Sequence, residues 1–426
     1  MRFLILTQYY PPEVGASQTR LAAMVRVMKN LGHKVEVVTA MPNHPTGRIF
    51  PEYRGRLYCR EESNGVTVHR VWLYPSTGAG LRRMINYLSF AAMSLVALLR
   101  ASRPDYIFVE SPPLFLSVPG YLMARRWGAK MIFNVADLWP DSVRELGLMK
   151  DGLALSFAAR LEKWTYRVAD RINAVTEGIR SALVERKGVP ASKILFLPNG
   201  VDTQLFRPRP ADNELALRLG LVGKKLILYT GTLGYAQGLE VALKAAATLR
   251  DRTDIVFVFV GGGSEVSNLK LLAKKWGLYN VVFLEPMPLE EVARLYSLAL
   301  AGFASLRNLP LFKGARPSKI LPIMASGVPV IYSGSGEGAR LIETAHAGIV
   351  TPPEDSQAFA DAVRLLAQNP DLAAHLGSNG RAYVERHLTW STLVADWLRQ
   401  LIEDSSSGGK YGEVQSEVAG GANEWE

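Results

Sequence analysis

The chain has 426 residues, a formal net charge of +10 at pH 7 and one cysteine, Cys59. This length exceeds what one ordinary hydrophobic core organises, and it predicts two domains of about 200 residues each. Hydrophobic residues make up 48% and charged residues 21%, a globular balance that excludes a largely disordered chain. A single cysteine excludes an internal disulfide and a cysteine-based zinc site, and it fits a reducing, cytoplasmic compartment.

The short apolar run in the amino-terminal sequence MRFLILTQYYPP is predicted to be a strand, because it is shorter than the apolar run of a secretory signal. The longest apolar stretch, residues 85–99, contains Asn86 and two serines and is shorter than the roughly 20 residues that a spanning helix needs. We therefore expect no transmembrane segment. Arg82 and Arg83 precede this stretch, so it is either a core helix of the first domain or a helix lying on an anionic membrane surface.

Basic residues dominate the first hundred positions, with thirteen Lys and Arg against five Glu. This excess predicts an anionic partner, such as a phosphorylated substrate or an anionic membrane. We expect no nucleic-acid partner, because the basic residues are scattered between apolar segments and no nucleic-acid motif is present.

Strand-like and helix-like segments alternate along the chain. Strands are expected at residues 3–8, 34–40, 105–110, 130–137 and 171–176, with a helix at 17–31 and an irregular loop at 41–55 that carries His44. A second series follows at 225–231, 255–262, 281–285, 301–306, 328–334 and 347–353. This alternation is typical of parallel βαβ units. It predicts two doubly wound α/β domains, residues 1–197 and 198–385, with a disordered acidic tail at 404–426.

Two glycine turns follow strands of the second series. Residues 260–265, VGGGSE, resemble the start of a dinucleotide fingerprint, but Val266 occupies the third glycine position, so we do not favour a dehydrogenase. The other turn, YTGTLGYAQGLE at 229–240, offers backbone N–H groups before a helix. Glycines also simply permit tight turns, yet two such turns in one sheet favour a nucleotide site.

Residues 314–338 form a third constellation. Pro317 and Ser318 are predicted to begin a helix with Lys319 in its first turn. A cation there opposes the helix dipole, and an anion sharing the site would account for it. The alternative is a solvated lysine.

These segments carry a family resemblance. PSKILPIMASGVPVI (317–331), LPNGVDTQLFRP (197–208), AGIVTPPEDSQAFADAV (347–363) and the two glycine turns resemble the donor half of family-4 retaining glycosyltransferases. YYPPEVGASQTRLA (9–22), GRIFPEYRG (47–55) and FNVADLWPDSVRELG (133–147) resemble the branch that builds cell-surface polysaccharides. The resemblance spans about residues 3–401.

The resemblance implies two Rossmann-like domains that face each other across a cleft, the GT-B architecture. The nucleotide sugar, with UDP favoured, would bind the second domain, and a saccharide or polyprenyl-diphosphate-linked acceptor would bind the first. A last helix, at about 386–403, would cross back to the first domain. Such enzymes retain the anomeric configuration and use no cofactor and no divalent metal.

The resemblance also implies roles for single residues. The residues expected at the donor are Gly15, Gly231, Thr232, Gly262, Ser318, Lys319, Glu337 and Gly338. The residues expected at the acceptor are Arg20, Asn43 and Trp139. The residues expected to act in catalysis are Asp137, Glu110 and Lys319.

Several family positions depart from the usual pattern. The family usually has two glutamates eight positions apart, where this chain has Gly314 and Pro322. Glu337 is the candidate substitute. With no acid at the usual place, we favour same-face attack over double displacement through an enzyme carboxylate. Two alternatives remain open: a nucleotide-sugar 2-epimerase, and a degenerate protein that binds a nucleotide sugar without catalysis.

Overall fold

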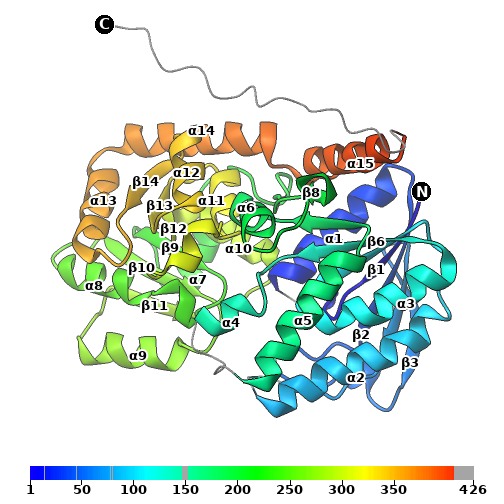
Figure 1. Cartoon of the computed structure of the whole chain (residues 1–426). Helices are drawn as coiled ribbons and strands as arrows, with labels where there is room; N and C mark the ends of the chain where they lie inside the picture. Colours follow the sequence, from blue (N-terminus) through cyan, green and yellow to red (C-terminus); the bar gives the residue numbers. More distant parts are fainter. Residues whose placement is uncertain (14, 45, 77, 79, 146–151, 407–426) are drawn as a thin grey trace, which may run out of the picture.

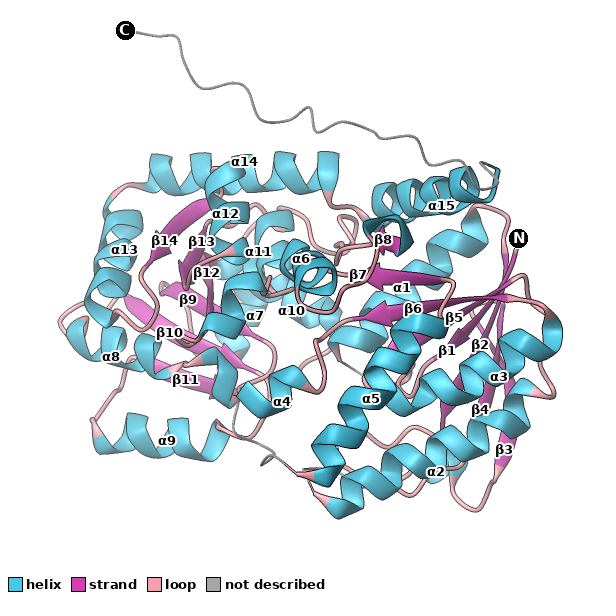
Figure 2. Cartoon of the chain, viewed as in Figure 1, coloured by secondary structure: helices cyan, strands magenta, loops and turns pink. Residues whose placement is uncertain are grey.

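A computed structural model describes residues 1–13, 15–44, 46–76, 78, 80–145 and 152–406, and it has two parallel α/β domains (Figures 1 and 2). The first sheet has eight strands in the order β3-β4-β2-β1-β5-β6-β7-β8, and the second has six in the order β11-β10-β9-β12-β13-β14. Every strand pair is parallel except β3–β4. The predicted pair of Rossmann-like domains is confirmed.

The strands of the first domain are β1 (Arg2–Leu6), β2 (Lys34–Ala40), β3 (Tyr58–Ser63), β4 (Val66–Val71), β5 (Tyr106–Ser111), β6 (Lys130–Val135), β7 (Arg171–Ala174) and β8 (Ile194–Phe196). Its helices are α1 (Ala16–Asn30), α2 (Leu81–Leu98), α3 (Ser117–Trp127), α4 (Asp141–Glu145), α5 (Leu153–Val168) and α6 (Glu177–Glu185). Successive residues of β1 enter opposite cores. Phe3 and Ile5 pack with Trp397, whereas Leu4 and Leu6 pack with Phe90, so both faces of the sheet are buried.

The strands of the second domain are β9 (Lys225–Thr230), β10 (Ile255–Val260), β11 (Val281–Leu284), β12 (Ala299–Ser305), β13 (Val330–Ser333) and β14 (Gly348–Thr351). Its helices are α7 (Asn213–Arg218), α8 (Glu240–Thr248), α9 (Val266–Lys275), α10 (Leu289–Leu295), α11 (Ile320–Ala325), α12 (Glu337–Thr344), α13 (Ser356–Gln368) and α14 (Pro370–His387). The apolar sequence of β10, IVFVFV, is buried at every position because helices cover both faces of the sheet.

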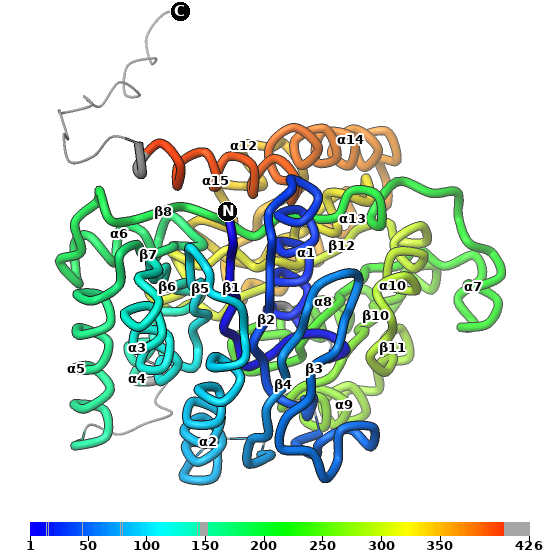
Figure 3. The backbone as a smooth tube through the Cα atoms, turned by 90° about the vertical axis from the view of Figure 1, so that its right-hand side faces the viewer, coloured from blue at the N-terminus to red at the C-terminus, as the bar shows by residue number. Residues whose placement is uncertain are grey.

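The chain crosses between the domains twice, and the two crossings are hydrogen-bonded to each other. Val201 N donates to Leu388 O at 2.9 Å, and Val201 forms a parallel bridge with Thr389. A side chain on Gly200 would press against the Trp390 ring at 2.9 Å. The last helix, α15 (Trp390–Ser406), then packs on α1 and β8 of the first domain (Figure 3).

The β3–β4 hairpin was not predicted, because the sequence of β3, YCREES, is too polar to suggest a strand. Arg70 of β4 is almost fully buried and donates to Glu61 of β3 at 2.6 Å, so the polar strand satisfies a buried cation. The last helix extends to Ser406, beyond its expected end at Glu403. The rest of the predicted tail, 407–426, lies outside the described residues. No helix in the described part of the chain is long and apolar enough to cross a bilayer.

Candidate donor and acceptor sites

The two glycine turns of the second domain interlock at the carboxyl ends of β9 and β10. Gly231 N donates to Val260 O at 2.9 Å, Leu233 N donates to Gly262 O at 2.8 Å, and Glu265 N donates to Leu233 O at 3.0 Å. The Gly231 N–H is therefore engaged within the turns. What Gly231 offers a ligand is space rather than a donor group.

Glycine is required where the two turns touch. Gly261 has φ +142° and Gly263 has φ +151°, and a side chain on either would collide with the backbone of Gly231 or Leu233. Thus the VGGGSE sequence is explained by close backbone approach at a ligand-binding edge, and not by a dinucleotide fingerprint.

Lys319 lies over this edge and is half-buried. Its Nζ donates to Tyr229 Oη at 2.7 Å and lies 4.4 Å from the centre of the Tyr229 ring. A side chain on Gly231 would stand 3.4 Å from Lys319 Cε, so the lysine and the first glycine turn are neighbours, as predicted. Burial lowers the pKa of Lys319 to about 7.

The start of α11 differs slightly from the prediction. The helix begins at Ile320, so Lys319 is the capping residue and does not lie in the first turn. Ser318 is exposed just before it, and its carbonyl accepts from Leu321 N at 3.2 Å. The Thr232 carbonyl accepts from Tyr229 Oη at 2.5 Å. These contacts bring Lys319, Thr232 and Gly231 together around one tyrosine.

Glu337, the first residue of α12, connects the two domains. Its Oε2 accepts from Gly178 N, in α6 of the first domain, at 3.0 Å. Because α12 follows β13 and α6 follows β7, this bond shows that the carboxyl edges of the two sheets meet here. Its neighbour Gly338 lies against the Tyr332 hydroxyl, with no room for a side chain.

Gly314 lies at the same junction, where the family usually has its first glutamate. A side chain on Gly178 would collide with the backbone of Gly314. The nearby Arg316 donates to Asn199 O at 3.2 Å, and burial lowers its pKa while Glu337 opposes that shift. The place of the usual acid is therefore filled by contact between the domains.

Arg20 and Glu110 form a buried ion pair beneath α1. Asn134 Nδ2 donates to the other carboxylate oxygen of Glu110 at 2.9 Å, and Asn173 Nδ2 donates to Asn134 Oδ1 at 2.6 Å. Burial raises the pKa of Glu110, and Arg20 and Asn134 oppose the rise. Arg20, predicted to bind the acceptor, and Glu110, predicted to act in catalysis, are thus paired with each other. The sequence does not reveal this pair, because the two residues are 90 positions apart.

Asp137 lies after β6, whose carboxyl end points toward the second domain (Figure 2). It accepts from Ser142 Oγ at 2.8 Å, and desolvation by surrounding protein raises its pKa although the residue keeps solvent exposure. Trp139 is half-buried and packs edge-on against Phe115, with ring centres 6.2 Å apart. Of the two carboxylates predicted to act in catalysis, Glu110 is buried and Asp137 is exposed at the carboxyl edge of the first sheet.

The loops after β1 and β2 are tied together by a residue that the sequence analysis missed. Glu13 Oε1 accepts from Asn43 N and from His44 N, each at 2.8 Å, and its Oε2 is buried. Burial raises the pKa of Glu13. Asn43 is itself buried and donates to Met41 O at 3.0 Å, and Gly15 caps α1 nearby in the chain.

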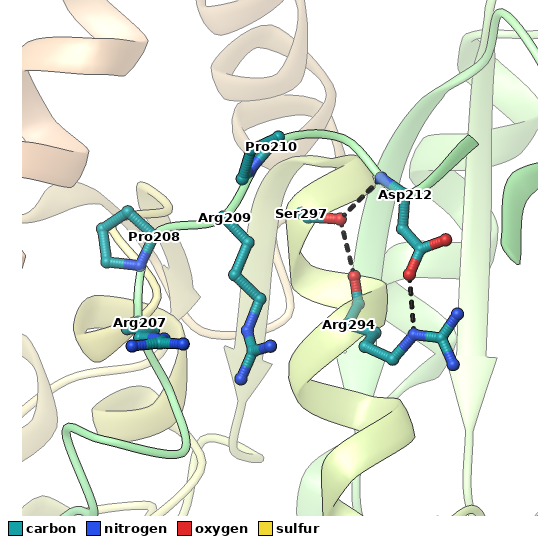
Figure 4. Close-up of a pocket in the computed structure, with 7 residues that line it drawn as sticks. All are labelled: Arg207, Pro208, Arg209, Pro210, Asp212, Arg294 and Ser297. Atoms are coloured by element: carbon teal, nitrogen blue, oxygen red, sulfur yellow. Dashed lines mark hydrogen bonds and ion pairs between the residues drawn. The ribbon is translucent and has the colours of Figure 1, made fainter. Parts of the chain in front are cut away.

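A cavity of about 450 Å³ lies elsewhere in the second domain (Figure 4). It is lined by Arg207, Pro208, Arg209, Pro210, Asp212, Arg294 and Ser297. Ser297 precedes β12, so the cavity lies at the edge where the strands begin, opposite to Lys319. Among the described residues, no group of His, Cys, Asp and Glu could hold a metal ion.

Comparison with known proteins agrees with this two-domain arrangement. Residues 15–200 match the glycosyl transferase 4-like domain, and residues 218–383 match the glycosyl transferases group 1. The chain is 30% identical over 422 residues to a protein of Escherichia coli (strain K12) named "Putative colanic acid biosynthesis glycosyl transferase WcaI", covering 95% of this chain and 99% of that protein. The fold is therefore that of a two-domain glycosyltransferase. The chain belongs to the family-4 glycosyltransferases, as the sequence resemblance predicted.

Two further matches span both domains. A GDP-mannose-dependent alpha-(1-6)-phosphatidylinositol monomannoside mannosyltransferase of Mycobacterium tuberculosis (strain ATCC 25618 / H37Rv) is 27% identical over 415 residues, 93% of this chain and 98% of that protein. The structure of sucrose-phosphate synthase from Thermosynechococcus elongatus superposes with a TM-score of 0.74 at 18% identity, covering 96% and 100% of the two chains. The second match shows the shared GT-B fold.

Proposed function

We propose that this glycosyltransferase moves a hexose or amino sugar from a UDP-sugar to a lipid-linked saccharide, with retention, during surface polysaccharide biosynthesis. The observation that carries the donor side is Lys319, held over two interlocked glycine turns. A cation in a partly enclosed site can stabilise the charge that develops on a departing diphosphate. Two relatives support the acceptor class, since one is named for colanic acid and the other for a phosphatidylinositol mannoside.

Same-face attack is the mechanism that we favour. The bond from the sugar C1 to the diphosphate oxygen breaks, the acceptor oxygen bonds to C1 on the same face, and the acceptor proton passes to the departing phosphate oxygen. Glu110 is a poor nucleophile for the alternative double displacement, because Arg20 and Asn134 engage both of its oxygens in the core. Trapping a covalent glycosyl-enzyme on Asp137 or Glu110 would contradict same-face attack.

The acceptor side has an exposed apolar surface that suits a lipid-linked substrate. Leu81, Ile85 and Leu88 lie on one face of α2, and Leu81 is 75% exposed. Leu153, at the start of α5, is 92% exposed. Both helices extend to the same side of the first domain (Figures 1 and 3). With the exposed Arg82, this surface supports docking on an anionic bilayer.

The membrane proposal predicts salt-sensitive binding to anionic vesicles. The protein should float with phosphatidylglycerol-containing vesicles at low salt and be released when salt screens the attraction. Arg82→Glu should weaken binding at least fivefold, since one basic residue near such a surface contributes about 1 kcal/mol. Lys244→Glu, an equal charge change on α8 of the second domain, is the control. If the two variants bind anionic vesicles equally well, docking through α2 is contradicted. It is also contradicted if the unaltered protein binds uncharged vesicles as well as anionic ones.

The proposed reaction is tested by release of the nucleotide. The purified protein is incubated with UDP- and GDP-sugars, with and without lipid-linked saccharide, and nucleotide and sugar products are measured. Acceptor-dependent release of nucleotide from UDP-sugars supports the proposal. Turnover with GDP-sugars alone would show that the donor nucleotide is GDP and that the prediction of UDP is wrong. Release of isomerised sugar without acceptor would indicate an epimerase. Saturable binding without turnover would indicate the degenerate protein.

A further inference from the structure

Lys319 has an unusual neighbour. Its Nζ donates to the phenol oxygen of Tyr229 at 2.7 Å and also lies over that ring, 4.4 Å from its centre. Both contacts favour an ammonium, because the oxygen lone pair and the ring face are electron-rich. Burial acts in the opposite direction and lowers the lysine pKa to about 7.

Tyr229 is itself fixed in place. It is fully buried, and its ring packs with Phe303 and Phe259 at centre distances of 5.2 and 6.1 Å. Its hydroxyl donates its single proton to Thr232 O at 2.5 Å. The oxygen therefore meets Lys319 as an acceptor, and the turn that contains Gly231 fixes its direction.

Few other ionisable groups act on this lysine. Tyr229 of β9 contacts it directly, and Tyr296 (in the short helix Tyr296–Leu298) raises the Tyr229 pKa from the far side. The Tyr296 hydroxyl is engaged with Thr230 Oγ1 at 2.7 Å. Burial is the cause that lowers the Lys319 pKa, and no ion pair joins this lysine to a carboxylate among the described residues.

We propose that Tyr229 is a positioning residue that holds the Lys319 ammonium charged and beside Gly231, ready for an incoming nucleoside diphosphate. This inference rests on the proposed donor site. It adds that the lysine alone is insufficient, because a half-buried amine without its acceptor would lose its proton or turn away.

The test is the pH dependence of nucleotide affinity. Titration calorimetry with UDP and with GDP, from pH 6 to 9, should show affinity falling as the pH rises through the lysine pKa, because only the charged amine attracts diphosphate. Tyr229→Phe keeps the ring and removes the acceptor. The fall should then begin about one pH unit lower, with affinity near pH 8 reduced about tenfold and affinity near pH 6 little changed. The phosphate groups of each nucleotide titrate in the same way whichever variant is used. Differences between the affinity curves of the variants therefore arise from the protein.

Tyr332→Phe is the matched control, since Tyr332 is a buried tyrosine of the same domain whose hydroxyl has no hydrogen-bond partner among the described residues. Its curve should overlie that of the unaltered protein. Suppose that the Tyr229→Phe curve also overlies the curve of the unaltered protein, while Lys319→Ala binds nucleotide weakly. This result would overturn the role of Tyr229 but would still support the donor site. Absence of nucleotide binding, or full affinity in Lys319→Ala, would instead overturn the donor site. If Tyr229→Phe does not fold, acetylation of Lys319 in the unaltered protein decides: half-maximal reactivity near pH 10 would overturn the proposal's premise of a buried, held amine.

Discussion

Replacing Lys319 with alanine should reduce kcat by about 10²- to 10³-fold, which is the usual effect of removing one group that stabilises developing negative charge. Nucleotide affinity should fall with it, because in the proposed donor site the same ammonium also meets the diphosphate in the ground state. Lys319→Met should behave like Lys319→Ala, since it keeps the length and packing of the chain but not the charge. Steady-state kinetics and calorimetry with the preferred nucleotide measure both effects.

A nearby lysine separates this effect from a general change of charge. Lys313 is exposed in the short helix Pro310–Gly314, a few residues before Lys319, and its backbone lies against Gly336. Lys313→Ala should keep kcat and nucleotide affinity within about twofold. If Lys319→Met is folded and turns over like the unaltered protein, Lys319 does not bind the diphosphate.

Breaking the buried pair of Arg20 and Glu110 should cost about 3–5 kcal/mol of the unfolding free energy, because the remaining buried charge has lost the opposite charge beside it. Arg20→Ala leaves a carboxylate in the core, and Glu110→Ala leaves a guanidinium. The double variant with leucine at both positions should recover much of the loss, since it buries no charge. Urea unfolding, followed by the fluorescence of the first domain, measures these differences.

The cost of Arg20→Ala should depend on pH. The folded protein holds the Glu110 proton to a higher pH than the unfolded chain does, so stability falls as the pH rises between the two pKa values. Without Arg20 this pKa rises further, and the deficit should be small near pH 4 and largest at neutral pH. Arg2→Ala, which breaks an exposed pair with Asp105, should cost less than about 1 kcal/mol. Equal costs for the two variants would contradict a buried charge pair.

The fold was predictable because periodic apolar strands and glycine turns are local signals. Residues 255–260 could be assigned from their own composition, and Gly261 and Gly263 marked the turn that follows. The β3–β4 hairpin was not, since Arg60, Glu61 and Glu62 look like a solvated loop until Arg70 is placed beside Glu61. The local sequence pattern therefore predicts a strand when its side chains enter an apolar core. It fails when the polar side chains of the strand are explained by contacts with a neighbouring strand.

Site residues were predictable only where the sequence motif that contains them identifies them. Lys319 and Gly231 are identified by their own motifs, and the structure brings them together. Glu337 was predicted to substitute for a glutamate that the family usually has, yet one of its oxygens accepts from Gly178, 159 positions away. Gly314 seemed to be a lost acid, and the structure shows a glycine contact between domains there. Long-range pairing of this kind leaves no mark in a single sequence.

The paired crossings between the domains have a mechanical consequence. Two chain segments that are hydrogen-bonded side by side, at Val201 and Leu388, can bend together but resist sliding past each other. Rotation of one domain on the other would then pivot along this pair, so groups distant from it travel furthest while their alignment is preserved. Bond formation demands that donor carbon and acceptor oxygen meet within a fraction of an ångström. A pivot that allows one rotation and prevents shear would restore that alignment at every turnover.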